Sequence, residues 1–245
     1  MYGEKTRALA FELRADGLSV AAIHRRLNVS RAAIAQWLIQ PPSARRVHDR
    51  CFICTGAPCS EGALYTYLLG QYLGDGYLVT RARVPKLRIA CADAYPAIAA
   101  EVDSAMTTLC GNRVSVTRAI GCSDHATYWT HWPCLLPQHG PGRKHERPIV
   151  LADWQRVIVE EHPWSLIRGL IHSDGCRVIN RVVVHGKAYE YLRYFFSNES
   201  VDIQAIFTAA LDQVGVPWRN NRANSVSIAR RAGVQLLDEH VGPKR

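Results

Sequence analysis

Residues 68–76 read Leu-Leu-Gly-Gln-Tyr-Leu-Gly-Asp-Gly, and residues 167–175 read Ile-Arg-Gly-Leu-Ile-His-Ser-Asp-Gly. Each stretch is an apolar helical segment that carries two small residues four positions apart and ends in Asp-Gly. Because residues four apart lie on one face of a helix, each copy has a face without bulky side chains. Two such helices are therefore expected to pack against each other at unusually short range.

The Asp-Gly pair that closes each copy predicts a cation site. Gly76 and Gly175 are suited to a left-handed turn at a helix C-terminus, and we expect that turn at both positions. Asp75 and Asp174 would then lie at the negative ends of two helix dipoles, beside unpaired helix carbonyls. Carboxylate and carbonyl oxygens are the ligands that magnesium prefers. The sequence therefore predicts a Mg²⁺ site where the two helix ends meet.

The two nonapeptides resemble the signature of the LAGLIDADG homing endonucleases. The matching positions are the glycine at the third place, the small residue at the seventh and the final Asp-Gly; the sixth place, often acidic in the family, is Leu73 or His172. The resemblance covers residues 64–245. It implies an α+β fold with two αββαββα modules related by a pseudo-twofold axis, whose antiparallel sheets form a saddle over DNA.

Further pairs of residues recur at a similar interval, which supports a duplication. The offsets are 99 residues between Asp75 and Asp174, 101 between His139 and His240, and 100 between Lys144 and Lys244. A constant interval of this size predicts two similar modules in one chain. We place the first module at residues 63–148 and the second at residues 149–245, in a monomer with internal pseudo-twofold symmetry.

The resemblance also implies site residues. In the family, the last carboxylate of each signature helix binds divalent metal, which assigns that role to Asp75 and Asp174. The family has a basic residue in each active site, and Lys144 and Lys244 occupy comparable places in the two halves. A lysine there can stabilise charge that develops during the reaction, or it can contact a phosphate without a chemical role. Metal-dependent hydrolysis of one phosphodiester bond per strand follows from this assignment.

Residues 1–42 are predicted to form a small all-α domain of the helix-turn-helix kind. The predicted helices span residues 5–16, 20–27 and 31–39. Ser19 and Ser30 have the side chains and positions of N-caps for the second and third helices. The arrangement resembles the helix-turn-helix of resolvase-like and transposase-like domains, in which Arg31 and Gln36 would read guanine and adenine in the major groove. An ordinary helical hairpin is the alternative.

Residues 43–62 are predicted to form a linker that carries a cysteine cluster. No apolar core of a signal peptide follows the N-terminus, so we expect a cytoplasmic, nucleoid-associated protein whose eight cysteines are thiols or metal ligands. A structural zinc site needs four ligands. The candidates are His48, Cys51, Cys54 and Cys59, or a set that includes the distant Cys122 or Cys134. A pair of reduced thiols is the competing interpretation of Cys51-x-x-Cys54.

Charge points to a polyanionic partner. The formal net charge of the 245 residues is +9, and double-stranded DNA is the partner that such a balance suits. No apolar run approaches the length that spans a membrane, so no membrane partner is expected. Basic residues of the predicted strands are the candidate DNA-binding side chains, and alternation puts Arg81 with Arg83, and Lys86 with Arg88, on one side of a sheet. The full set is Arg81, Arg83, Lys86, Arg88, Arg177, Arg181, Arg193, Arg230 and Arg231.

Two functions are compatible with these features. The first is a site-specific, magnesium-dependent endonuclease of double-stranded DNA. The second is a sequence-specific transcriptional regulator without cleavage, similar to WhiA-type proteins that join a LAGLIDADG-like domain to a helix-turn-helix. Those regulators tend to have lost the acidic pair, whereas Asp75 and Asp174 are both present here, so the sequence favours the enzyme. An RNA-binding protein such as an intron-splicing maturase has little support beyond the fold.

Overall fold

The computed structural model describes residues 4–39, 50–81, 83–242 and 244. The chain divides into two compact units, Met1–Asp49 and Arg50–Arg245. Residues 50–62, which the sequence analysis assigned to the linker, lie in the second unit. Among the described residues, no helix combines the length and the apolar character needed to cross a bilayer.

The first unit is the predicted set of three helices. They are α1 (Glu4–Ala15), α2 (Val20–Leu27) and α3 (Arg31–Ile39). The Oγ atoms of Ser19 and Ser30 accept hydrogen bonds from backbone N–H groups three residues later, both at 3.2 Å, so the predicted N-caps are confirmed. Asn28 ends α2 with a φ of 51°, a left-handed conformation that asparagine tolerates well.

A small apolar core holds these three helices together. Its buried residues are Ala10, Leu13, Ile23, Val29 and Ile34. Arg31 and Gln36 are exposed on α3. The predicted recognition residues therefore lie on the surface of the helix that follows the turn.

The second unit contains the αββαββα order twice, as predicted. The first module consists of α5 (Gly62–Gly74), β1 (Gly76–Val79), β2 (Lys86–Ala92), α6 (Pro96–Cys110), β3 (Ser115–Ala119), β4 (Cys122–Tyr128) and α7 (Trp132–Leu135). The second consists of α9 (Pro163–Asp174), β5 (Gly175–Val184), β6 (Lys187–Ser197), α10 (Val201–Gln213), β7 (Arg219–Arg222), β8 (Ser225–Ile228) and α11 (Arg231–His240). The short α4 (Phe52–Thr55) precedes the first module, and η1 (Lys144–Glu146) and α8 (Asp153–Glu161) join the two.

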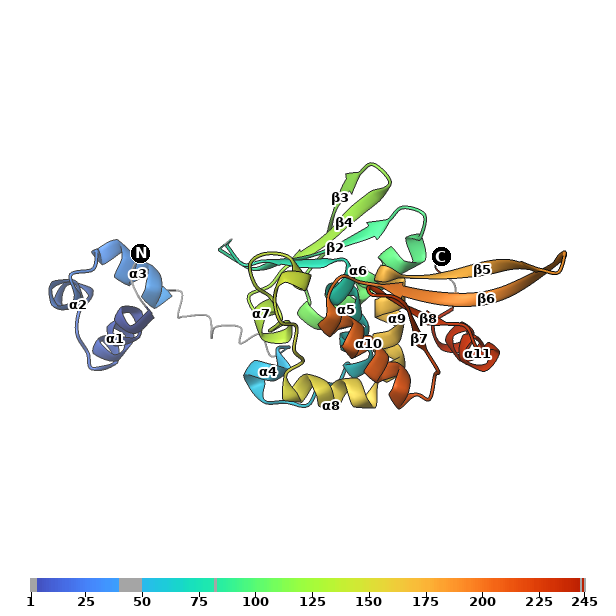
Figure 1. The fold of residues 1–245 in the computed structure, drawn as a ribbon. Helices are drawn as coiled ribbons and strands as arrows, with labels where there is room; N and C mark the ends of the chain where they lie inside the picture. The colour runs from blue at the N-terminus through green and yellow to red at the C-terminus, as the bar shows by residue number, and fades with distance from the viewer. Residues whose placement is uncertain (1–3, 40–49, 82, 243, 245) are drawn as a thin grey trace. The chain divides into compact units, whose positions relative to one another are not determined.

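Each module builds a four-stranded antiparallel sheet with the same topology. The strand orders are β1-β2-β4-β3 and β5-β6-β8-β7. The glycine after each signature helix opens the first strand in both, with Gly76 opposite Ile89 and Gly175 opposite Phe196. Strand β5 is one continuous strand of ten residues. Its hairpin with β6 extends beyond the rest of the unit (Figure 1).

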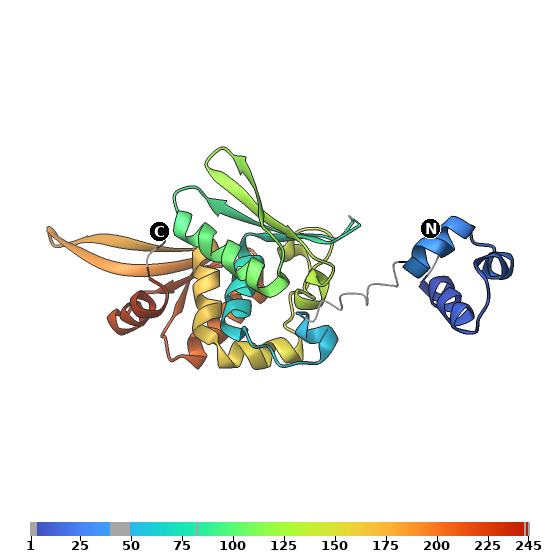
Figure 2. The same ribbon diagram turned by 180° about the vertical axis from the view of Figure 1, so that it is seen from behind.

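The signature helices α5 and α9 lie side by side at the centre of this unit (Figures 1 and 2). A Cβ atom on Gly169 would be 2.2 Å from the carbonyl oxygen of Tyr67, and one on Gly70 would be 2.8 Å from the carbonyl oxygen of Leu166. At Gly74 an added Cβ would be 2.4 Å from the Cβ of Ser173. The close packing predicted from the small residues is therefore confirmed.

The two glycines that end the signature helices do not adopt the expected left-handed turn. Gly175 has φ −101° and ψ 168°, which is extended backbone, and Gly76 begins strand β1. Both positions need glycine for space. An added Cβ would be 2.5 Å from the Cα of Tyr72 at Gly76 and 2.7 Å from the Cα of Ile171 at Gly175. The glycines let each chain pass directly from helix into strand.

The sixth place of the second signature serves packing. His172 is buried, and burial, together with the nearby Arg168 charge, lowers the pKa of its imidazole to about 4. The hydroxyl of Tyr67 accepts a hydrogen bond from the amide of Gln71 and lies 3.3 Å from Nδ1 of His172. A neutral histidine in this polar group therefore replaces the acid that is common at this place in the family.

Candidate functional site

Lys144 ties η1 to the end of the first signature helix. Its Nζ donates to the carbonyl oxygens of Tyr72, Leu73 and Gly74 at 2.5, 3.0 and 2.7 Å. These carbonyls belong to the last turn of α5, where intrahelical partners run out, and of the three that of Tyr72 also accepts from the backbone N–H of Asp75. The sequence analysis expected them to be open to a metal, but the ammonium group of Lys144 occupies them.

Lys244 makes the matching contact in the second module. Its Nζ donates to the carbonyl oxygen of Ser173 at 2.9 Å, near the end of α9. Each lysine also lies over an aromatic ring, with Lys144 5.2 Å from the centroid of Tyr72 and Lys244 5.7 Å from that of Tyr95. The two lysines that sequence spacing paired thus have equivalent places at the ends of the paired helices.

The two signature carboxylates share one electrostatic environment. Desolvation by the surrounding protein and then the charge of Asp174 raise the pKa of Asp75 to about 6. Burial also raises the pKa of Asp174, against the opposing effect of Asn198, whose Nδ2 donates to Asp174 Oδ2 at 2.6 Å. The helix ends therefore concentrate negative charge where solvent stabilises it poorly.

Lysines and acids influence each other most strongly across the two modules. Burial lowers the pKa of Lys144 to about 8, and Asp174 is the acid that opposes this shift most. Burial also lowers the pKa of Lys244, and there the strongest opposing charge is that of Asp75. The strongest electrostatic coupling therefore pairs Lys144 with Asp174 and Lys244 with Asp75, one residue from each module, although neither pair forms a salt bridge among the described residues.

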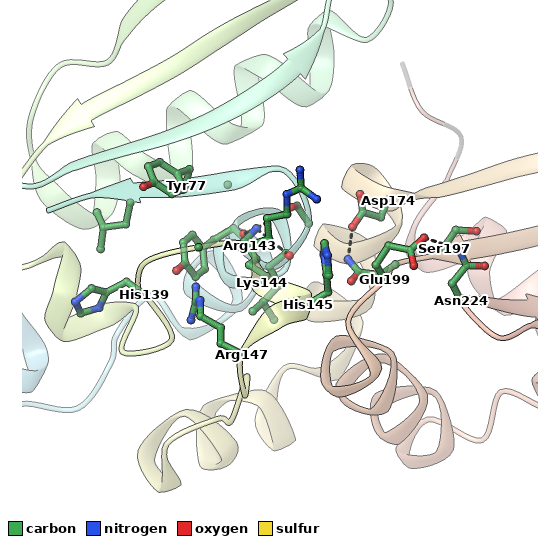
Figure 3. A pocket seen from close by; sticks show the side chains of 18 residues that line it. Tyr77, His139, Arg143, Lys144, His145, Arg147, Asp174, Ser197, Glu199 and Asn224 are labelled. Carbon is green, nitrogen blue, oxygen red and sulfur yellow. Dashed lines mark hydrogen bonds between the residues drawn. The ribbon is translucent and has the colours of Figure 1, made fainter.

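An open pocket contains one of these pairs. Its volume is about 500 Å³, and Figure 3 shows Lys144 and Asp174 on its walls, with Arg143, His145 and Arg147 nearby. The cationic side chains of Arg143, Lys144 and Arg147 outnumber the two carboxylates of the lining, Asp174 and Glu199, which suits an anionic ligand.

Sequence reasoning did not select three polar residues of this pocket. Asn198, Glu199 and Asn224 line it on the side of the second module, and Asn224 Nδ2 donates to Glu199 Oε1 at 2.6 Å. In sequence, Asn198 and Glu199 look like an ordinary turn before helix α10. Only the position of that turn beside α9 brings Asn198 to Asp174.

The basic residues of β2 lie on the sheet face that points away from the core. Leu87 and Ile89 are fully buried, so the alternating Lys86 and Arg88 lie on the other face, which we call the open face. Arg88 forms an ion pair with Asp124 of the neighbouring strand β4, in which Ala126 is the residue directly opposite Arg88. Lys86 is 5.3 Å from the ring centroid of Tyr128 and has no acidic partner within salt-bridge distance among the described residues. Lys86 is thus the better candidate for a phosphate contact.

In the second module the open face contains Arg193. It alternates with Tyr194 and Phe196, which are fully buried, and its guanidinium lies 5.6 Å from the ring centroid of Phe195. Arg177 was expected on this face but lies on the opposite one. Its Nε and Nη2 donate to the carboxylate of Asp238 in α11 at 2.7 and 2.8 Å. Arg177 therefore connects the sheet to a helix.

The remaining predicted DNA contacts are not arranged as the strand pattern suggested. Strand β1 ends at Val79, so Arg81 and Arg83 are exposed in the connection to β2. Arg181 shares the side of Arg177 and pairs with Glu190 at 2.8 Å. Arg230 and Arg231 are exposed at the start of α11, not in a strand.

The cysteine cluster differs from the predicted ligand set. Cys51 and Cys54 approach His131 and Cys134, and the four ligand atoms all lie within 4.8 Å of one another. Cys59 packs against the apolar core and is not part of this group, whereas His48 lies outside the described residues. Cys134 was an alternative ligand in the sequence analysis; His131 was not selected, because it lies 77 positions after Cys54 with no signal that links them.

Two αββαββα modules packed through their signature helices define the fold of the LAGLIDADG homing endonucleases. The homing endonuclease I-WcaI bound to its DNA recognition sequence superposes with a TM-score of 0.51 at 11% identity, over 83% of this chain and 89% of that chain. The LAGLIDADG meganuclease I-AabMI bound to uncleaved DNA gives 0.46 at 11% identity, over 72% and 84%. Full-length DUF199/WhiA from Thermatoga maritima gives 0.47 at 13% identity, over 81% of this chain and 61% of that chain.

At the N-terminus, residues 1–38 match the family model of a homeodomain-like domain. This match agrees with the three helices and two serine caps of the first unit. No curated protein matches the sequence.

Proposed function

We propose that this protein is a site-specific endonuclease that uses divalent metal to hydrolyse one phosphodiester bond in each strand of DNA. The observation that carries the proposal is the group of two carboxylates and two lysines at the ends of α5 and α9, where Lys144 and Lys244 donate to backbone carbonyls of the two signature helices. Lys144 shares a pocket with Asp174, and the charge of Asp75 acts on Lys244. Two equivalent arrangements in duplicated modules suit a duplex, whose two backbones are themselves related by twofold symmetry.

The residues at the helix junction fit a divalent cation. Asp75 and Asp174 offer hard oxygen ligands of the kind that magnesium takes. Burial raises the pKa of both carboxyl groups because it disfavours their charged forms, which a cation would stabilise. When bound, such an ion supplies an activated water and neutralises charge on the phosphate and the leaving oxygen.

The surrounding side chains orient and complement this centre. Three backbone carbonyls hold the ammonium of Lys144, and with a pKa of about 8 it stays charged at neutral pH. It can therefore offset negative charge on a phosphate without first reorganising. The Asn198 amide fixes one oxygen of Asp174 by its hydrogen bond, which leaves the other oxygen for a ligand.

Two further features support DNA as the substrate. The open faces of both sheets present cationic side chains, Lys86 in the first module and Arg193 in the second. The first unit adds Arg31 and Gln36, exposed on the helix after the turn, where homeodomain-like and helix-turn-helix domains read bases. Most contacts of this kind set affinity, and a few set specificity.

Selection from a randomised duplex library tests the proposal. The full chain is incubated with the library with and without Mg²⁺, and cut and bound fractions are sequenced separately. Scission that occurs at a defined site, and only when Mg²⁺ is present, supports the endonuclease function. Enrichment of a bound sequence without scission, under all metals tried, would instead assign the protein to the regulators.

Lys144→Met is expected to lower the single-turnover cleavage rate about 100-fold, the effect of removing one preorganised donor from a reacting charge. DNA affinity should change by less than threefold. In the parent protein the rate should fall as pH rises through about 8, because the ammonium that carries the charge is lost above its pKa. Lys187→Met, at an exposed position of the β5–β6 hairpin, is the charge-matched control. Equal rates for the two variants would assign Lys144 a structural role only.

Lys86→Ala and Arg177→Ala are expected to affect DNA binding differently. Lys86 lies on the open face, so its removal should reduce the slope of log K against log salt concentration by about 1. Arg177 is engaged by Asp238 on the other face, so its removal should leave the slope unchanged. Fluorescence anisotropy titrations at several salt concentrations measure both. A reduced slope for Arg177→Ala alone would mean that the second sheet presents its other face to DNA.

A further inference from the structure

Two short helices in the first module bring four metal-binding side chains to one point. Cys51 and Cys54 belong to the turn that forms α4, and His131 and Cys134 belong to the turn that forms α7. The spacing is two intervening residues in each pair, as in zinc knuckles. About eighty residues of sequence separate the pairs, so the tertiary structure alone brings them together.

Four of the distances between the ligand atoms lie close to those of a tetrahedral zinc site. Zinc bonds of about 2.3 Å to sulfur and 2.0 Å to nitrogen place two sulfurs about 3.8 Å apart and a sulfur and a nitrogen about 3.5 Å apart. Cys54 Sγ lies 3.4 Å from Cys51 Sγ and 3.7 Å from Cys134 Sγ. His131 Nδ1 lies 3.2 Å from Cys54 Sγ and 3.9 Å from Cys134 Sγ.

A disulfide does not account for this arrangement. The 3.4 Å between the sulfurs of Cys51 and Cys54 exceeds the bond length of about 2.05 Å. A disulfide between any two of the thiols would also not explain why the third thiol and the imidazole lie at the same point. We infer that Cys51, Cys54, His131 and Cys134 bind one structural Zn²⁺ ion.

The ion would connect elements that have little stability of their own. Helices α4 and α7 have four residues each, far below the length at which a helix is stable alone. Phe52 of α4 contacts the core through edge-on packing against Tyr65 and Trp154. Zinc adds the cross-link to α7, and α7 leads into the loop that carries Lys144. The ion therefore fixes both the start of the second unit and the origin of that loop.

Metal analysis of the full chain, purified without chelators, tests this inference directly. We expect one zinc per chain in the parent protein and less than one fifth of that in Cys54→Ser and in Cys134→Ser. Cys59→Ser is the matched control, because Cys59 is close in sequence but outside the cluster; it should keep the full zinc content. Replacement by Co²⁺ should give the thiolate charge-transfer and d–d absorption of a tetrahedral site with three sulfurs.

Two measurements keep the inference falsifiable if a serine variant fails to fold. Cys134→His offers a replacement ligand and should retain metal, with a cobalt spectrum of fewer thiolates. Mass spectrometry of the unreduced parent protein determines the state of Cys51 and Cys54. A metal-free chain that takes up no added Zn²⁺, or one that contains a Cys51–Cys54 disulfide, would overturn the assignment. None of these readouts depends on DNA cleavage.

Discussion

Asp174→Asn is expected to lower double-strand cleavage by about 1,000-fold, equivalent to roughly 4 kcal/mol of transition-state stabilisation. The substitution keeps the shape of the side chain and removes the negative charge that would bind the metal beside Lys144. Because Asn198 donates to Asp174 Oδ2, and an asparagine oxygen can accept the same bond, the local fold should persist. Single-turnover assays on the selected target, resolved on native and denaturing gels, measure the loss.

A measurement of DNA affinity and a control substitution at another aspartate complete this experiment. DNA affinity should stay within threefold of the parent value. The variant does not weaken binding, because it removes repulsion between the carboxylate and a phosphate. Asp153→Asn, at an exposed position in α8, should cleave like the parent protein. If Asp174→Asn cleaves at the parent rate, the carboxylate is not in the reaction site and the proposed enzyme function is wrong for this centre.

Gly169→Ala is expected to destabilise the second unit by about 3 kcal/mol or more, at the upper end of overpacking effects. The added methyl group would lie 2.2 Å from the carbonyl oxygen of Tyr67. That oxygen belongs to the backbone of α5 and cannot rotate aside, so the two helices must separate and lose contact along their length. Urea unfolding monitored by tryptophan fluorescence gives the change in the free energy of unfolding.

Gly140→Ala provides the control for this substitution. The atoms nearest to an added Cβ there belong to the flexible Arg147 side chain and lie 3.4 Å or more away, so the expected change is within about 0.5 kcal/mol. Equal stability of Gly169→Ala and Gly140→Ala would show that α5 and α9 are not in close contact in solution. The acids at their ends would then no longer be held together.

Much of the fold follows from local patterns. The serine caps are contacts within three residues, and the small residues four apart and the alternation in β2 are periodic patterns within one helix or strand. Such patterns are encoded in neighbouring positions, and the structure reproduces the helices and most strands they predict. The left-handed turns at Gly76 and Gly175 were wrong because space beside Tyr72 and Ile171, not backbone conformation, requires glycine there.

Contacts between residues that are distant in sequence could not be predicted from local patterns. The alternating pattern around Arg177 shows that its neighbours lie on the other side of the strand, but not which side faces the core. Helix α11, which brings Asp238 to Arg177, decides what Arg177 contacts. Likewise, the short sequence separation between Cys54 and Cys59 made Cys59 a predicted zinc ligand. The packing of α7 against α4 selects His131 and Cys134 instead.

The sequence by itself determined that the chain has two related modules, each with a signature helix that ends in an acid, and a three-helix unit before them. The tertiary structure alone decided which charges act together. It set Lys144 against Asp174 of the other module and placed its ammonium on the carbonyls of α5. The reason is that helix-forming patterns are local, whereas electrostatic interactions depend on distances in space that chain topology sets.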